Sequence, residues 1–190
     1  MASKAKMIGS IESTQPKTAV EERDVLLRST REEEIRHRAY EIYVRRGAQP
    51  NGEPEDWIQA EREENRWLYL SYLEFCNEHD VQRMASFYTP TIKVNDVPMD
   101  PAAVAAQFPP LFSAFPDWHW EIRHLVVDGD NIAVRFTVTG SHRGLFREIE
   151  ATGRRVTTSE FTVYRVEDGR FAEVWDLTDL DAVMRQIRQG

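Results

Sequence analysis

The sequence has little of what disulfide-bonded or membrane-spanning proteins need. Its 190 residues include one cysteine, Cys76, so no internal disulfide can form, and this usage suits a reducing compartment. No run of about 18 apolar residues occurs, and the N-terminal residues lack the apolar centre of a signal peptide. We therefore expect a cytoplasmic protein that carries no membrane-spanning helix.

Motifs for metals and nucleotide cofactors are also missing. The five histidines and the cysteine show neither H-E-x-x-H nor C-x-x-C spacing. His119 and His124 are five residues apart, which would place them on opposite faces of a strand. There is no glycine-rich phosphate loop and no nucleophile elbow. We expect no metal and no cofactor.

Positive charge is in short supply as well. The chain has 24 basic and 32 acidic residues, a net charge of −8. Nucleic-acid binding needs a basic face that contacts phosphates, so this balance argues against such a partner. The one local exception is a basic cluster in the N-terminal third, made of Arg36, His37, Arg38, Arg45 and Arg46.

Alternating apolar and polar residues predict a curved antiparallel sheet in the C-terminal part of the chain. Alternation at period two is the signature of a strand with one buried face. A second run, 156–166, is followed by Asp168-Gly169, which predicts a tight hairpin. In the third run, 171–179, Trp175 and Asp179 share a face if no bulge intervenes. The first run starts at Asn131 and has one apolar face, formed by Ile132, Val134, Phe136 and Val138.

Upstream of the sheet, the pattern is helical and then mixed. Residues 1–30 show no apolar period and are expected to be a disordered tail. Residues 31–64 predict a helix-loop-helix module in which Gly47 stops the first helix and Pro54 opens the second. The second helix could continue to Asn77 because no breaker interrupts it. Further elements are expected in 65–190: a short helix capped by Asp80, strands over 91–97 and 118–127, a helix over 101–112 and a short C-terminal helix.

The residues of this C-terminal part also carry a family resemblance. The segments FYTPTIKVND, FPDWHWEIRHLVVDGD, VRFTVTGSHRG and VYRVEDGRFAEVWDLTD resemble the SnoaL-like polyketide cyclases of the nuclear-transport-factor-2-like superfamily. The resemblance covers roughly residues 65–190. It implies an α+β fold, a cone-shaped sheet with helices over its concave face, a hydrophobic polyketide-like substrate and a homodimer. The segment IRHRAYEIYVRRGAQPNGEPEDWIQAEREE resembles a small bacterial helix-loop-helix module with no assigned function.

Asp179 is the leading candidate for a catalytic acid or base. The resemblance places the family's catalytic aspartate at the matching end of the W-x-x-x-D motif that starts at Trp175. Aldol ring closure removes a proton from carbon and later protonates the attacked oxygen, and one buried carboxyl of raised pKa can do both. Alternatively, Asp179 caps the C-terminal helix. A solvated or helix-capping Asp179 would argue against the enzyme.

Other side chains are candidates for contact with a substrate. His142 lies in a turn that matches the family's G-x-H-x-G and either bonds a substrate carbonyl or fixes its own loop. Asn95 either positions a substrate oxygen or forms an Asn-Asp turn. Glu160 and Tyr164 share one face of the penultimate strand, but the pattern does not show which face lines the pocket. Trp175 and His119 complete the set of expected pocket residues.

The sequence departs from the family at one position. Cyclases of this family carry a histidine on the penultimate strand, whereas this chain has Tyr164 and Arg165 there. Two hypotheses therefore stay open. One is cofactor-free acid/base cyclisation or isomerisation of a hydrophobic molecule. The other is a non-catalytic binding or accessory protein that uses the same pocket, while the N-terminal module recruits a partner.

Overall fold

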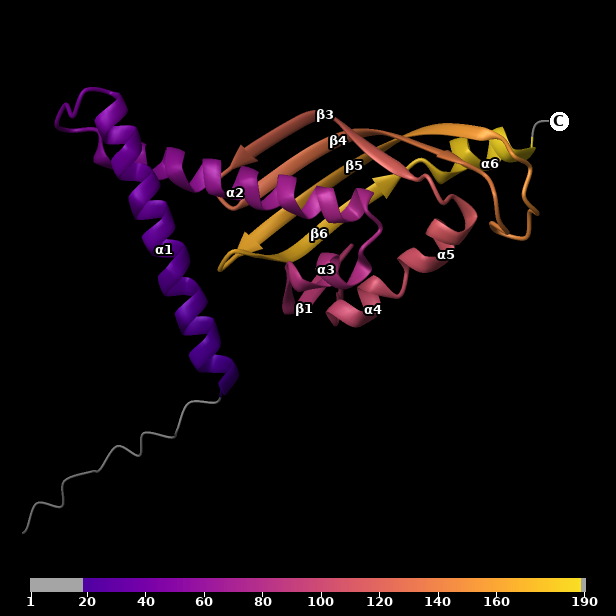
Figure 1. Cartoon of the computed structure of the whole chain (residues 1–190), viewed down its shortest axis with the longest axis horizontal. Coiled ribbons are helices and arrows are strands. Elements are labelled where there is room, and N and C mark those ends of the chain that lie inside the picture. Colours follow the sequence, from indigo (N-terminus) through magenta and orange to yellow (C-terminus); the bar gives the residue numbers. More distant parts are fainter. Residues whose placement is uncertain (1–18, 189–190) are drawn as a thin grey trace, which may run out of the picture.

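The fold is α+β, with one six-stranded sheet and helices on its concave side (Figure 1). The computed structural model describes the backbone of residues 19–188 and the side chains of residues 30–188. The strands are β1 (Tyr88–Val94), β2 (Val97–Met99), β3 (His119–Asp128), β4 (Asn131–Ser141), β5 (Arg155–Glu167) and β6 (Arg170–Thr178). The helices are α1 (Ala19–Arg45), α2 (Glu53–Asn77), α3 (Val81–Ser86), α4 (Pro101–Ala105), α5 (Phe108–Ala114) and α6 (Leu180–Arg188).

The first helix is longer than the sequence predicted. It begins at Ala19, so residues 19–30, which we expected in a disordered tail, are helical; residues 1–18 lie outside the described range. The helix ends at Arg45, and Gly47 follows with φ of 85°, as predicted.

The second helix is continuous from the N-terminal module into the main domain. It starts with Pro54 in its first turn and runs unbroken through residue 65. In its first half, Ala60 packs with Ile35 and Ile42 of α1 in a small separate core. The predicted boundary between residues 64 and 65 therefore falls inside α2, and no linker separates the two parts.

Asn65 also connects the module to the sheet. Its side chain is buried, accepts a hydrogen bond from Arg31 of α1 at 2.8 Å and donates one to the carbonyl of Gly129 at 3.0 Å. Gly129 lies in the turn between β3 and β4. The helix-loop-helix module is thus docked on the end of the sheet.

Strands β3 to β6 form an antiparallel meander, and β1 adds to β6 in parallel. The hairpin predicted at Asp168-Gly169 is confirmed, because both residues have positive φ and join β5 to β6. The apolar face predicted for β4 is also confirmed, and all four of its residues are buried: Ile132, Val134, Phe136 and Val138.

Two bulges change which side chains face inward. On β6, Phe171 pairs with Val166 and Glu173 pairs with Arg165, so Ala172 is an extra residue without a partner. The alternation therefore reverses after Phe171, and Val174 rather than Trp175 points into the core. A similar shift at Arg123 interrupts β3.

The long helix covers the concave face mainly through its C-terminal half (Figure 1). Tyr69, Tyr72 and Cys76, at spacings of three and four, are buried against the sheet. Trp67, on the other side of the same helix, is 67% exposed. The predicted helix over 101–112 is divided into α4 and α5, since Pro109 starts a new helix in the first turn of α5.

Asp179 caps the C-terminal helix. Its Oδ1 accepts a hydrogen bond from the backbone N–H of Ala182 at 2.9 Å, three residues further on, and its side chain is exposed. The following helix packs Val183, Met184 and Ile187 into the core, so this end of the sheet depends on the cap.

We predict that Asp179→Ala destabilises the protein by about 1 kcal/mol, which lowers the melting temperature by about 2–4 °C. Thermal unfolding followed by circular dichroism measures the change. Asp181→Ala is the matched control, because it removes a carboxylate from the same helix turn without removing the cap. Equal effects of the two substitutions would contradict the capping role.

Candidate active site

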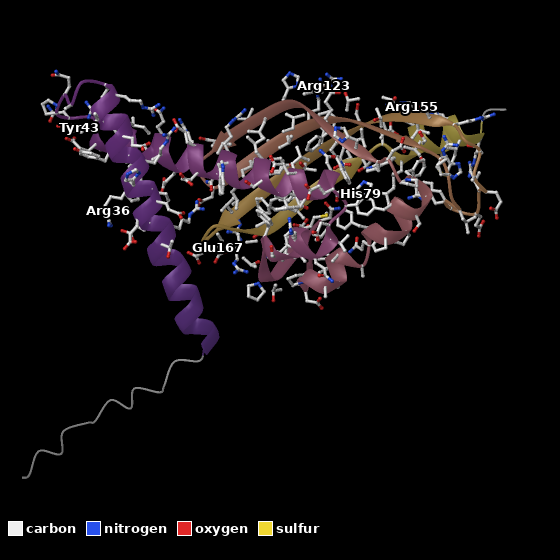
Figure 2. All side chains as sticks on the ribbon, in the orientation of Figure 1. Arg36, Tyr43, His79, Arg123, Arg155 and Glu167 are labelled. Carbon is white, nitrogen blue, oxygen red and sulfur yellow. The ribbon has the colours of Figure 1, made fainter. Side chains whose placement is uncertain are left out.

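A cavity of about 370 Å³ lies between the concave face of the sheet, α2 and α5. Its wall is mostly aromatic and aliphatic, and its charged members are Arg147, Glu160 and Asp176. Figure 2 shows side chains filling the space under α2, with His79 between the end of that helix and α5. A concave apolar site with a few polar groups is the usual form of a small-molecule pocket.

Glu160, on β5, is a half-buried residue whose carboxyl lines this cavity. Both of its oxygens accept the indole N–H of Trp120, at 3.1 and 3.0 Å, and Oε2 also accepts the hydroxyl of Thr178 at 2.8 Å. Burial raises the pKa of Glu160 above its ordinary value, and the negative charge of Asp176 adds to the rise. The two hydrogen bonds favour the charged form but do not outweigh the desolvation.

The end of α2 holds Trp120 in position. The backbone N–H of Trp120 donates to Asn77 Oδ1 at 2.8 Å, and the amide of Asn77 donates to the Trp120 carbonyl at 3.1 Å. Next to it, His79 Nε2 lies 2.8 Å from the Trp118 carbonyl and stacks on Phe112 at 3.8 Å. The start of β3 is thus fixed from both sides, and with it the donor that holds Glu160.

A cluster of phenols forms another part of the wall. The ring of Tyr164 packs against Tyr69 and Tyr72, and the hydroxyls of Tyr72 and Tyr88 are 2.7 Å apart. Burial raises the pKa of all four phenols, so each stays a neutral hydrogen-bond donor. Burial likewise raises the pKa of the Cys76 thiol to about 12, which leaves it unreactive, as expected for a core cysteine.

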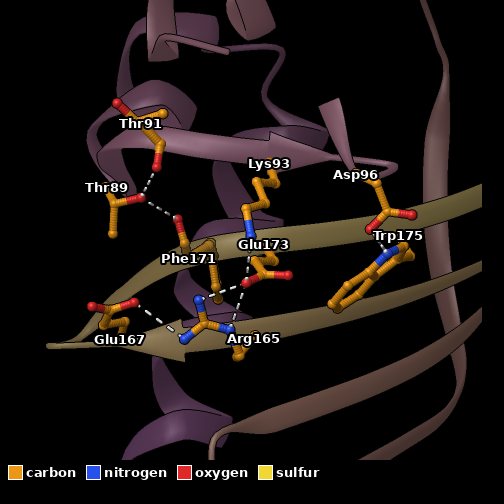
Figure 3. A network of polar contacts seen from close by, with 9 residues as sticks. All are labelled: Thr89, Thr91, Lys93, Asp96, Arg165, Glu167, Phe171, Glu173 and Trp175. Atoms are coloured by element: carbon orange, nitrogen blue, oxygen red, sulfur yellow. Dashed lines mark hydrogen bonds and ion pairs between the residues drawn. The ribbon is translucent and has the colours of Figure 1, made fainter. Parts of the chain in front are cut away.

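The predicted position of Asp179 in the pocket is wrong. Its carboxylate is exposed and caps α6, and it is not part of the cavity wall. Trp175 also lies outside: its indole N–H donates to Asp96 at 3.0 Å on the outer side of the sheet (Figure 3). Both errors have one cause, the bulge at Ala172, which turns Val174, Asp176 and Thr178 inward in their place.

The same outer face carries an ion-pair network. Arg165 donates to Glu173 at 2.8 Å, and Lys93 contacts the same carboxylate at 3.4 Å (Figure 3). Arg165 is thus the cross-strand partner of Glu173.

His142 is fully buried outside the cavity wall. Its Nδ1 lies 3.0 Å from the Thr152 hydroxyl and accepts the Thr152 backbone N–H at 3.3 Å, while its ring stacks on Phe115. His142 therefore does not line the cavity in which it was expected to contact a substrate carbonyl. The imidazole fixes its own loop, which was the alternative.

Asn95 and His119 are also outside the cavity wall. Asn95 has φ of 47° in a two-residue turn with Asp96, and its side chain makes hydrogen bonds to the backbone N–H and the carboxylate of Asp176. Asn95 therefore supports Asp176, a residue of the cavity wall, without reaching the cavity itself.

His119 is exposed on the outer face of the sheet. The bulge at Arg123 turns His124 to the same face, whereas the sequence predicted that the two histidines lie on opposite faces.

Of the predicted pocket residues, Glu160 and Tyr164 line the cavity together. Sequence reasoning missed Trp120, Thr178, Asp176 and Arg147. Strand pairing would have found one of them, because Thr178 is directly opposite Glu160 once the bulge is known. Nothing in the sequence marks the indole of Trp120 as a carboxylate donor.

Across residues 30–188, three or more histidine, cysteine or carboxylate side chains do not gather at any point that could hold a metal ion. Within the described part of the chain, no helix is both long enough and apolar enough to cross a membrane.

Solved structures share this fold. TsrD from Streptomyces laurentii is 28% identical, with a TM-score of 0.60 over 67% of this chain and 96% of its own. AclR from Streptomyces galilaeus, a proposed hydroxylase, is 25% identical, with a TM-score of 0.61 over 66% and 96%. A SnoaL-like polyketide cyclase from Agrobacterium tumefaciens is 25% identical, with a TM-score of 0.57 over 65% and 97%.

Two families match adjacent parts of the chain, and the boundary between them falls inside α2. Residues 30–63 match a family described as a protein of unknown function (DUF2934), and residues 66–187 match the SnoaL-like polyketide cyclase family. No curated protein matches the chain. The matched region contains every strand, the cavity and Glu160, and the resemblance seen in the sequence is confirmed. The chain belongs to the SnoaL-like polyketide cyclase family.

Proposed function

We propose that this protein is a cofactor-free acid/base enzyme that cyclises or isomerises a hydrophobic, polyketide-like molecule, with Glu160 as the catalytic acid and base. The observation that carries the proposal is a half-buried carboxyl in the wall of a largely apolar cavity, where desolvation raises its pKa. Family membership supports the reaction class. A raised pKa lies closer to neutral pH, so the same carboxyl can both accept and donate a proton there.

The proposed steps need no other reactant. The Glu160 carboxylate takes a proton from a carbon next to a substrate carbonyl, giving an enolate and a neutral Glu160. In ring closure the enolate carbon forms a bond to a second carbonyl carbon, and the resulting alkoxide takes the proton from Glu160. In isomerisation the proton returns to a different carbon. Trp120 and Thr178 hold the carboxyl throughout, and neutral phenols such as Tyr164 are available as donors to the carbonyl oxygen.

A non-catalytic binding protein is the second candidate. The exposed position of Asp179 favours it, since this chain lacks both the pocket aspartate and the penultimate-strand histidine that the family resemblance implied. The two candidates differ in whether the cavity moves a proton.

We predict that the wild type accelerates hydrogen–deuterium exchange at C1 of 2-tetralone, an apolar enolisable ketone, in D₂O. Glu160→Gln should lower this acceleration by about 10²–10⁴-fold, because it removes the base without changing its shape. Proton NMR measures the exchange above the uncatalysed rate. Asp179→Asn, which keeps the helix cap, should retain the wild-type rate.

The outcomes separate the two candidates. Loss of exchange in Glu160→Gln alone supports the proposal, and loss in Asp179→Asn alone would transfer the role to Asp179. A wild type that binds 2-tetralone by native mass spectrometry, yet exchanges it no faster than buffer, would indicate a binding protein.

Stability should depend on the ionisation of Glu160. Because its pKa is raised on folding, the folded chain binds the proton more tightly than the unfolded chain. The resulting stabilisation is complete below the unfolded pKa of about 4.3 and is lost as the pH rises through the raised folded value. Glu160→Gln is always neutral, so its melting temperature relative to the wild type should rise between about pH 4.5 and pH 8. A difference that stays constant with pH would contradict the burial of this charge.

We further propose a homodimer through the outer face of β5 and β6. Phe161 and Leu177 are paired across these strands and are 53% and 71% exposed. Val163 and Trp175 form the next pair, so the apolar residues are contiguous. Such a face can pair with a second copy of itself around a two-fold axis.

Leu177→Arg is predicted to convert the dimer to a monomer, because it places a charge in the centre of this patch. Size-exclusion chromatography with light scattering at micromolar concentration reads out the mass. Leu145→Arg, which changes a leucine of similar exposure (61%) outside the patch, should remain dimeric. A monomeric wild type would refute the proposed assembly.

A further inference from the structure

The loop between β4 and β5 is built onto α5 next to the cavity. The backbone N–H groups of Arg143 and Gly144 both donate to the Ala114 carbonyl, at 2.8 and 3.1 Å. A Cβ at Gly144 would lie only 2.4 Å from the Ser113 carbonyl oxygen, so this close approach requires glycine. Together with the buried His142, these contacts fix where the loop meets the cavity.

A two-residue turn follows on this anchored base. Phe146 and Ile149 exchange two backbone hydrogen bonds, at 3.0 and 2.9 Å, and enclose Arg147 and Glu148. Both enclosed residues have positive φ, 44° and 67°, in a turn that normally prefers asparagine and glycine. The ring of Phe146 packs on Phe115, 5.1 Å between centroids, and lines the cavity.

Arg147 is the positive charge of the cavity wall. It is exposed, so its guanidinium lies where the cavity meets solvent, 5.8 Å over the ring of Phe146. Among the described residues, it has no hydrogen bond and no carboxylate within ion-pair distance. Nor is it the counter-ion of Glu160, since the neighbouring charge that acts on the Glu160 carboxyl is that of Asp176.

The position of Arg147 indicates which chemical group a substrate of this cavity carries. A guanidinium binds a carboxylate through two parallel N–H donors. These donors stay available when the guanidinium lies over an aromatic ring. The acidic side chains Glu160 and Asp176 would repel an anion elsewhere in the cavity. An anionic group of the substrate would therefore bind only beside Arg147.

We infer that Arg147 binds a carboxylate on an otherwise apolar, ring-bearing substrate, and so sets which end of the molecule reaches Glu160. The inference rests on the proposed function and deepens it: the substrate class becomes an aromatic or polycyclic organic acid rather than a neutral ketone or ester. Arg147 is a specificity residue and takes no part in proton transfer.

Two fluorescent probes of nearly the same shape test this inference without turnover. 8-Anilinonaphthalene-1-sulfonate carries one anionic group, and N-phenyl-1-naphthylamine is its neutral counterpart. Arg147→Gln should raise the dissociation constant of the anionic probe by about tenfold and change that of the neutral probe by less than about twofold. Arg143→Gln removes an equal charge from the same loop outside the cavity wall and should leave both constants within about twofold.

Competition extends the test to a carboxylate. 2-Naphthoate should displace the neutral probe from the wild type at about tenfold lower concentration than its methyl ester does, and Arg147→Gln should abolish the difference. A wild type that binds the neutral probe but shows no preference for either anion overturns the inference and leaves the proposed function standing. Equal loss in Arg143→Gln and Arg147→Gln also overturns it, because long-range charge would then explain the binding. Binding of neither probe would contradict the cavity itself, and with it the proposed function.

Discussion

The register of the last strand decides what this cavity contains. One extra residue, Ala172, reverses the alternation of β6 after Phe171. Successive side chains of a strand alternate between its two faces. One extra residue therefore sends every side chain after it to the opposite face. Thr178 and Asp176 reach the cavity, whereas Trp175 and Leu177 form the outer surface. The hydroxyl donor of Glu160 and the β6 half of the proposed dimer face therefore both depend on the same bulge.

Burial of Glu160 is the chemical result of this packing. A carboxyl that loses water without gaining a cation is easier to keep protonated, and Glu160 has an indole and a hydroxyl as partners instead of an arginine or lysine. The cation of the wall, Arg147, does not offset this effect. Separating the acid from the cation lets one cavity hold a proton-transfer group and an anion-recognition group without either neutralising the other.

Much of the fold could be predicted from local patterns. The buried face of β4, the Asp168-Gly169 hairpin, the Asp80 cap and the continuous α2 follow from alternation, turn chemistry and the lack of a breaker. The residues of the site were harder to predict, because the register of the strands decides which side chains face the cavity. The W-x-x-x-D motif suggested Asp179, yet the alternation that would aim it inward fails at the bulge, and no local residue preference marks Ala172 as the bulged position. Glu160 was identified as a candidate, but the alternation of β5 did not show which of its faces lines the pocket, and its pairing with the buried Phe136 of β4 does.

The proposed function requires Glu160 to be a desolvated carboxyl that can exchange a proton with the substrate. The most direct measurement is a pH titration of the side-chain carboxyl carbons by ¹³C NMR, with glutamate labelled at Cδ and Glu160→Gln used to assign the signal. The account predicts one glutamate, absent from the variant, whose pKa lies clearly above the ordinary value of about 4.3. If the Glu160 signal titrates at or below that value, the carboxyl is solvated or paired, and the proposed acid/base role does not hold.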